Sequence, residues 1–411
     1  MTLERRFLIL TATRWLSTGF LIPVTAVFML SRGLSIAEVG IAVAVQSAVV
    51  LVLELPTGGL ADSIGRRRVL LLAGVLDVVA LTWFVLSSSL LGFMIAWALQ
   101  GVFRALDSGP LEAWYVDESL AADAGADIET GIARSGTAIG GAISVGALGA
   151  AALVAIGPLG GVEALALPVL VALVLRVVDL AAKALLVEER RRPTASGVRG
   201  AVREGLRVVL HGQALRALVL VEVFWGAGLV GVELLSGPRL VELFGDPEQG
   251  VAMLGVTAAI AWSISGAGAA ATGWLVRRSG STTRAAVLMR VAQGAAVAVM
   301  AAVAGPAGLV AGYLGFYLVH GAANAVHYGM LHRLAGPGER ATVLSVSSLT
   351  SRIGGIGADV GFGALAAGAG IAAGFWASAV LLVAGVPLYL IAGRASPAGA
   401  RQPEPAPASM P

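Results

Sequence analysis

Long apolar runs separated by short polar links follow one another along nearly the whole chain. The runs lie near residues 7–30, 36–60, 69–88, 90–115, 129–155, 162–187, 214–236, 249–275, 284–304, 307–332, 342–366 and 370–393. Their lengths match the roughly 20 residues that an α-helix needs to cross the hydrocarbon core of a bilayer. Their apolar residues are continuous, whereas the strands of a membrane β-barrel alternate apolar and polar residues. The pattern therefore predicts an all-α membrane protein with twelve transmembrane helices.

The charged residues in the links predict which side of the membrane each link faces. If the N-terminus is cytoplasmic, most basic residues fall in even-numbered links, and the odd-numbered links hold almost none except Arg32 and Arg239. Basic residues are retained on the cytoplasmic side of a membrane. The even-numbered links contain Arg66 to Arg68, Arg190 to Arg192, Arg199, Arg203, Arg207, Arg277, Arg278, Arg284, Arg333 and Arg340. We therefore expect a multi-pass protein of the cell (plasma or inner) membrane with both termini in the cytoplasm.

The longest polar segment divides the predicted helices into six and six. It covers residues 188–213, and in its second part valine and leucine recur at helical spacing opposite arginine. This pattern is typical of an amphipathic helix on the membrane surface. We expect an N-terminal six-helix bundle at 1–187, this segment as a cytoplasmic linker, and a C-terminal six-helix bundle at 214–395. The tail at 396–411 is rich in proline and alanine, and we expect it to be disordered.

Composition restricts the possible classes of function. Hydrophobic residues make up 57% of the chain and charged residues 13%, with a net charge of +3. The arginines cluster in links, which fits membrane topology and argues against a nucleic-acid partner. The chain has no cysteine, its four histidines lack metal-ligand spacing, and no Walker loop occurs. We expect no enzyme activity, no catalytic residues, no metal site and no cofactor.

A charged motif links the second and third predicted helices. It contains Gly58, Asp62, Gly65, Arg66 and Arg67. The glycines allow close packing and a tight reversal, and the arginines hold the link at the membrane surface. The spacing resembles the link between helices two and three of major facilitator superfamily (MFS) transporters, except that Ser63 stands where the family usually has a basic residue. We expect a conformational latch between the two halves, with Asp117 as the partner of Arg66; the alternative is a topology signal only.

The family resemblance implies a fold of two pseudo-symmetric six-helix bundles. An offset of 215 residues supports it by aligning Pro23 with Pro238, Gly40 with Gly255, Gly58 with Gly273, and Gly65 with Gly280. Residues 104–109 and 136–141 are also similar to motifs of the family's bacterial drug:proton antiporters. The resemblance thus implies a secondary active transporter for multidrug efflux, which exports a small, moderately apolar molecule by proton antiport. An uptake symporter for a small organic solute and a transport-inactive membrane sensor are the alternatives.

Ionisable residues inside the predicted helices are costly, so each is a functional candidate. Arg14, Glu54, Asp107 and Glu222 fall at comparable depths in the cytoplasmic half of the membrane, where they can share one cavity. By resemblance, the first, fourth, seventh and tenth helices line the central cavity. The predicted substrate and proton pathway consists of Arg14, Glu54, Arg104, Asp107, Glu222, Glu233, His320 and Asn324.

Asp107 is the first candidate for the proton carrier, with Glu222 and Glu54 as alternates. Burial favours the protonated form of a carboxyl group and a nearby arginine favours the charged form, so a change of surroundings can load and release a proton. Arg14 and Arg104 can provide that change for Asp107. The alternative is that Arg14 and Asp107 only neutralise each other.

Further charged residues lie in the sixth and eleventh predicted helices. We expect Arg176, Asp179 and Lys183 to form a self-compensating ladder whose basic ends reach toward the cytoplasm. The pattern assigns no role to Arg352 and Asp359. The expected partners are a small-molecule substrate, protons and the lipid bilayer, and we expect the protein to be a monomer.

Overall fold

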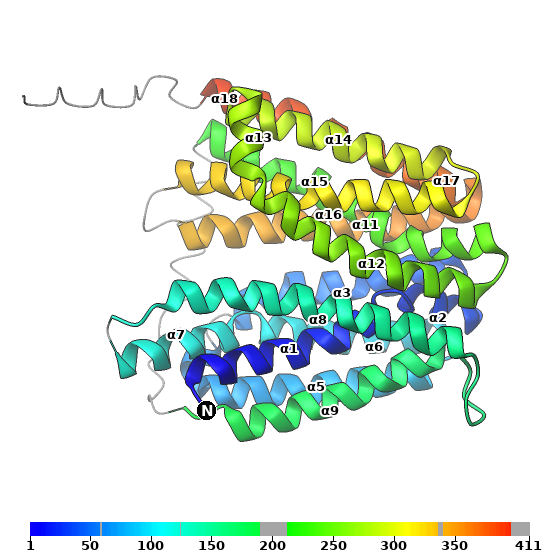
Figure 1. Ribbon diagram of the computed structural model, residues 1–411, viewed down its shortest axis with the longest axis horizontal. Helices are drawn as coiled ribbons and strands as arrows, with labels where there is room; N and C mark the ends of the chain where they lie inside the picture. Colours follow the sequence, from blue (N-terminus) through cyan, green and yellow to red (C-terminus); the bar gives the residue numbers. More distant parts are fainter. Residues whose placement is uncertain (58–59, 124, 190–211, 336–339, 396–411) are drawn as a thin grey trace, which may run out of the picture.

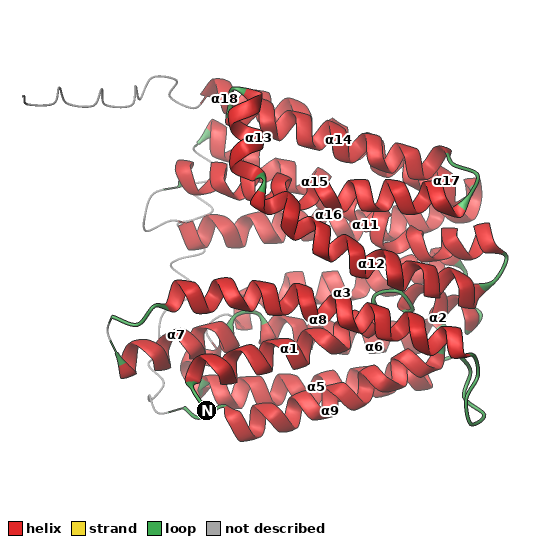
Figure 2. Cartoon of the chain, viewed as in Figure 1, coloured by secondary structure: helices red, strands yellow, loops and turns green. Residues whose placement is uncertain are grey.

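The computed structural model describes residues 1–57, 60–123, 125–189, 212–335 and 340–395, and nearly all of them are helical (Figure 2). Gly58, the predicted amphipathic helix of the linker and the tail at 396–411 lie outside the described residues. The side chains of residues 55, 56, 61, 62 and 341 are also outside the description, which leaves the role expected of Asp62 untested.

Each half of the chain forms a bundle of helices that run side by side (Figure 1). The N-terminal half contains α1 (Leu3–Leu21), α2 (Thr25–Ser31), α3 (Ile36–Thr57), α4 (Leu60–Ile64), α5 (Arg66–Leu86), α6 (Leu90–Asp107), α7 (Pro110–Ala122), α8 (Ile128–Ile156) and α9 (Ala166–Leu186). The C-terminal half contains α11 (Gln213–Phe244), α12 (Pro247–Ala270), α13 (Thr272–Ser279), α14 (Thr282–Ala302), α15 (Pro306–Leu334), α16 (Arg340–Ala369), α17 (Ile371–Ala384) and α18 (Val386–Ala395).

The described helices account for the twelve predicted spans. Nine helical segments are long and apolar enough to cross a membrane, and α1 with α2 forms a tenth that bends by 43°. The helices α9 and α16 supply the sixth and eleventh spans, although ionisable and glycine residues make them less apolar. The predicted all-α fold with twelve helices is therefore confirmed.

Some predicted spans are divided into two helices. Gly109 separates α6 from α7 inside the fourth predicted span. Gly65 separates α5 from α4, which lies in the link after the second predicted span. Each of these glycines has a φ of 97°. Glycine adopts this left-handed backbone without the steric cost that a side chain adds. Asp107 is consequently the last residue of α6, whereas the hydropathy pattern continued that span to residue 115.

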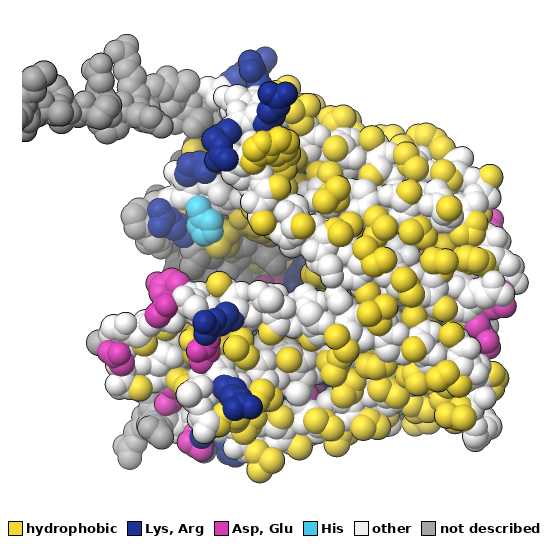
Figure 3. Space-filling view, in the orientation of Figure 1, with side chains coloured by type: hydrophobic (Ala, Val, Ile, Leu, Met, Phe, Trp, Pro, Cys, Tyr) yellow, Lys and Arg dark blue, Asp and Glu magenta, His cyan; other side chains and the backbone are white. Residues whose placement is uncertain are grey.

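Apolar packing joins the two halves toward one end of the molecule. We call the end with the N-terminus, α7 and α13 the basic end, and the opposite end the closed end (Figure 1). At the closed end one hydrophobic cluster joins both halves, with Val27 of α2 beside Gly237 of α11 and Leu254 of α12. At the basic end each half has its own cluster, around Trp114 in one and Leu331 in the other. Figure 3 shows a hollow between the halves that opens at the basic end.

The internal repeat corresponds to symmetric contacts between the halves. Gly40 of α3 packs against the carbonyl group of Asp359 in α16, and Gly255 of α12 packs against the carbonyl group of Ala147 in α8. Neither position has room for a side chain. The second span of each half thus packs on the fifth span of the other, as expected for parallel repeats related by a two-fold axis.

Candidate functional site

The space between the halves contains two charged side chains that form no ion pair with any described residue. Arg104 of α6 and Glu233 of α11 are both exposed. They interact electrostatically although they belong to different halves. Exposed charged side chains within membrane spans face a cavity and not lipid. We therefore infer that Arg104 and Glu233 face the hollow between the halves.

Aromatic side chains of the C-terminal half lie around Glu233. Tyr313 and Tyr317 of α15 interact with its charge, and their ring centroids are 4.8 Å apart. The His320 ring lies 5.5 Å from the Tyr317 ring and 5.7 Å from the Trp225 ring of α11. This wall of the hollow therefore combines a carboxylate with flat apolar rings.

Asn324 extends the same wall by one helical turn. Its amide Nδ2 lies 3.0 Å from Nε2 of His320, and both side chains are partly exposed. Glu233, His320 and Asn324 of the predicted pathway are thus close together, on the side of the C-terminal half that faces the hollow.

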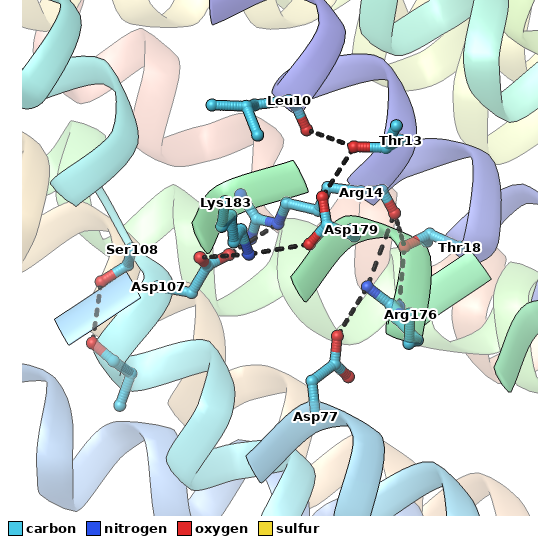
Figure 4. Close-up of polar contacts among 11 residues, drawn as sticks. Leu10, Thr13, Arg14, Thr18, Asp77, Asp107, Ser108, Arg176, Asp179 and Lys183 are labelled. Atoms are coloured by element: carbon cyan, nitrogen blue, oxygen red, sulfur yellow. Dashed lines mark hydrogen bonds and ion pairs between the residues drawn. The ribbon is translucent and has the colours of Figure 1, made fainter. Parts of the chain in front are cut away.

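A buried charge network occupies the N-terminal half (Figure 4). Asp107 at the end of α6 lies 2.6 Å from Nε of Arg14 in α1 and 3.5 Å from Nζ of Lys183 in α9. Lys183 is also 2.9 Å from Asp179, which accepts a hydrogen bond of 2.7 Å from Thr13. The Asp107 and Lys183 side chains are each 1% exposed. The expected contact of Arg14 with Asp107 is confirmed, but Asp107 also has a second cation beside it.

The predicted charge ladder of α9 is largely wrong. Arg176 pairs with Asp77 of α5 at 2.9 Å and donates a hydrogen bond of 3.2 Å to Thr18 of α1. Lys183 is fully buried, so neither basic group reaches toward the membrane surface, and only the contact of Lys183 with Asp179 lies within the helix. Asp77 was missed as a partner. A lone carboxylate in an otherwise apolar helix was the available signal.

The C-terminal half buries a different network. Glu222 Oε1 of α11 lies 2.8 Å from Nε2 of His327 in α15, and Nδ1 of His327 lies 2.9 Å from the hydroxyl group of Tyr389 in α18. Arg290 of α14 donates to that hydroxyl at 3.4 Å and to Gln293 at 2.8 Å. Because the hydroxyl accepts from Arg290, it can donate its proton to Nδ1, which leaves Nε2 as the nitrogen that faces Glu222 with a proton.

The expectation that Arg14, Glu54, Asp107 and Glu222 share one cavity is wrong. Asp107 and Glu222 are each buried inside their own half. Glu54 of α3 instead forms an ion pair of 3.2 Å with Arg352 of α16, which joins the two halves. The direction in which each side chain points depends on helix packing, which the position of a residue along its helix does not give.

In the charged motif between the second and third spans, Arg66 makes the predicted ion pair, and its partner belongs to the same half. Arg66 lies 2.8 Å from Asp117, and these residues belong to α5 and α7 of the same half. The carboxylate of Glu189 accepts from the backbone N–H groups of Arg66 and Arg67, at 2.8 and 3.3 Å. The Arg67 side chain donates to the carbonyl group of Val187 at 2.9 Å. In this conformation the motif binds the start of α5 to the end of α9, so the Arg66 to Asp117 pair cannot itself bridge the two halves.

Among the described residues, no group of three His, Cys, Asp or Glu side chains is placed to hold a metal ion. The ionisable residues inside the helices are instead matched mainly with one another. The site that the structure defines is thus a polar and aromatic hollow between two bundles, with a buried network behind each wall.

The sequence matches the Major Facilitator Superfamily over residues 7–358, and the chain belongs to this family of membrane transporters. A mutant of the nucleoside transporter NupG superposes with a TM-score of 0.79 at 14% identity, covering 95% of this chain and 100% of that one. A bacterial homolog of the human lysosomal transporter Spinster, inward-facing and unoccupied, gives 0.75 at 15% identity and covers 96% of each chain. The human organic anion transporter MFSD10 gives 0.64 at 18% identity, covering 95% of this chain and 100% of that one. No curated protein matches the sequence.

Proposed function

We propose that the protein is a secondary active transporter of the cell membrane that exports a small, moderately apolar molecule in exchange for protons. The observation that carries this proposal is the hollow between the halves, which has charged and aromatic walls and is closed at one end. A site reached from one side at a time is what alternating access requires. With the basic end in the cytoplasm, as the positive-inside rule favours, this conformation is open to the inside.

The buried networks change the order of the proton candidates. Asp107 lies beside Arg14 and the buried Lys183, so protonating it would leave two cations with less counter-charge, which is costly. Among the described residues, the ion pair of Glu222 is with His327, and histidine is the residue type that gains and loses a proton near neutral pH. We therefore place proton uptake at the Glu222 and His327 pair and no longer at Asp107.

Two helices connect the Glu222 and His327 pair to the aromatic wall of the hollow. Glu222 lies on α11 and His327 on α15, and the same two helices carry Glu233 and His320. A proton converts the pair from a carboxylate beside a neutral ring into a carboxylate beside an imidazolium. The stronger attraction alters the packing of α11 on α15 behind the wall of the hollow.

The function is tested by transport in proteoliposomes that contain the purified protein. A pH gradient is imposed, and the fluxes of protons and of a panel of lipophilic cations and antibiotics are measured together. We expect at least one compound to accumulate against its own gradient while protons move in the opposite direction. Movement of both in the same direction would support uptake by symport, and the absence of any gradient-driven flux would reject the proposal.

The orientation is tested with single cysteines, because the chain has none of its own. Ser63 and Ser281 lie at the basic end, Ser88 and Leu159 lie at the closed end, and all four are exposed. Cysteine at the first two positions should react with a membrane-impermeant reagent only from the cytoplasm, and at the other two only from outside. Labelling of a cysteine at position 63 in intact cells would show that the basic end faces outward.

A further inference from the structure

We propose that Arg104 and Glu233 together bind a ligand that carries one anionic and one cationic group on an aromatic body. The anionic group contacts Arg104 on the N-terminal half, and the cationic group contacts Glu233 on the C-terminal half. This inference names the substrate class of the proposed transporter and therefore rests on the proposed function.

The first support is that these two charges are unpaired where comparable charges are paired. Arg14 lies 2.6 Å from its carboxylate partner, and Arg352 lies 3.2 Å from its own. Glu222 lies 2.8 Å from His327. An ionised group at membrane depth is costly without a partner, so unpaired charges there indicate function. Arg104 and Glu233 are the exposed charges in the hollow that the described residues leave without an ion pair.

The second support is that the two charges lie on opposite walls of the hollow. Arg104 and Glu233 interact with each other, although no ion pair joins them. An anionic group that enters the hollow can therefore contact Arg104 while a cationic group contacts Glu233. A ligand with both charges is thus held in one orientation across the hollow.

The third support is the aromatic wall beside Glu233. Tyr313 and Tyr317 interact with its charge, and Trp225 and His320 continue the ring surface, with centroids 5.7 Å apart. Flat rings bind another aromatic ring by offset stacking, and they attract a cation placed over their faces. A ligand whose cationic group is close to an aromatic body matches both features of this wall.

A matched set of indole compounds tests the two charges separately. Tryptophan carries both charges, tryptamine only the cation, indole-3-propionate only the anion, and 3-methylindole neither. Binding of labelled tryptophan to the purified full-length protein is measured, and the other compounds compete. We expect tryptophan to bind at least about tenfold more tightly than either singly charged compound, because each loses one charge-assisted hydrogen bond. Glycerophosphocholine, which has both charges but no ring, should compete weakly.

Two substitutions assign each charge to its residue. In Glu233→Gln, tryptophan should bind no better than indole-3-propionate, and in Arg104→Gln it should bind no better than tryptamine. Both residues are exposed and unpaired, so the folded state should persist, and thermal unfolding checks this. Glu242→Gln on α11 and Arg278→Gln on α13 are matched controls that remove an exposed charge outside the hollow and should leave binding unchanged.

Several results would overturn the inference. They are equal binding of the four indole compounds, no binding at millimolar concentration, or the same preference in both variants. Competition by glycerophosphocholine as strong as that by tryptophan would instead indicate a lipid headgroup and reject the aromatic ligand. If proton-driven flux of other compounds persists in these cases, only this inference fails, whereas loss of all gradient-driven flux rejects the proposed function.

Discussion

The two halves bury polar networks at corresponding places but build them from different chemistry. In the N-terminal half the residues come from α1, α5, α6 and α9, and in the C-terminal half from α11, α14, α15 and α18. These are the first, third, fourth and sixth spans of each half. The N-terminal network is made of arginine, lysine and aspartate, whereas the C-terminal network contains a histidine beside a glutamate.

The difference supports the proposed division of roles between the halves. Ion pairs among arginine, lysine and aspartate join the helices of the N-terminal network to one another. The C-terminal network contains histidine, which is the residue type that proton-dependent switches use. In the proposed function, one half is therefore a fixed support and the other responds to protons.

The largest effect should follow from breaking the fixed network. Lys183→Met leaves the buried Asp179 without its cation, and we expect a loss of about 3–5 kcal/mol in stability. Unfolding of the purified protein by heat or denaturant measures this loss. The double variant Lys183→Met with Asp179→Asn removes one charge of each sign and should recover much of it. Equal stability of the single and double variants would contradict a tightly coupled network.

Two isosteric substitutions, one in each network, should destabilise the protein to different extents. Asp107→Asn leaves Arg14 and Lys183 without a full counter-charge, and should cost about 3 kcal/mol or more. Glu222→Gln leaves His327 neutral and still able to form a hydrogen bond, and should cost about 1 kcal/mol. Thermal unfolding of both variants under the same conditions tests the difference. The comparison of the halves fails if the two variants lose the same stability.

A smaller effect is expected at the ion pair that joins the halves. Glu54 and Arg352 are partly exposed, so their interaction should contribute about 1 kcal/mol or less to the conformation that is open at the basic end. Removing Glu54 by Glu54→Gln should shift the population toward the outward-open conformation by several-fold. The accessibility of cysteines at positions 63 and 88 is measured in Glu54→Gln, in Arg352→Gln and in the double variant. The three results give the coupling free energy between Glu54 and Arg352. Strictly additive changes would mean that the two residues do not interact.

The smallest effect should come from breaking the Arg66 to Asp117 ion pair. The Arg66 to Asp117 pair is partly exposed and lies within one half, so Arg66→Ala should change stability by about 1 kcal/mol or less. Its effect on the two conformations should be smaller than that of Glu54→Gln. The same accessibility assay measures both variants. A larger shift in Arg66→Ala would restore the interpretation of this pair as a latch between the halves.

The fold was predictable because hydropathy and charge asymmetry are properties of the sequence alone. Length and apolar content define a membrane span, and arginines define its ends. The breaks inside the predicted spans were harder to predict from the sequence. Gly109 ends α6 through its left-handed backbone, but a glycine in an apolar run does not reveal its φ angle.

The candidate site was predictable only in part. Arg14, Asp107 and Glu222 were identified because ionisable residues are rare in apolar helices. The partners of these residues were harder to predict, because a contact between helices depends on the rotation of each helix about its axis. His327 was considered only as one of four histidines without metal-ligand spacing, because its partner Glu222 lies on another helix.

The most direct test of the central claim is proton-coupled transport by Glu222→Gln in proteoliposomes, with a substrate of the wild-type protein. The substitution removes the carboxylate beside His327 while keeping the size of the side chain. We predict that accumulation driven by a pH gradient is lost, while downhill exchange of substrate in the absence of a gradient continues. Uphill accumulation with the pH dependence of the wild-type protein would contradict the assignment of the proton to the C-terminal half.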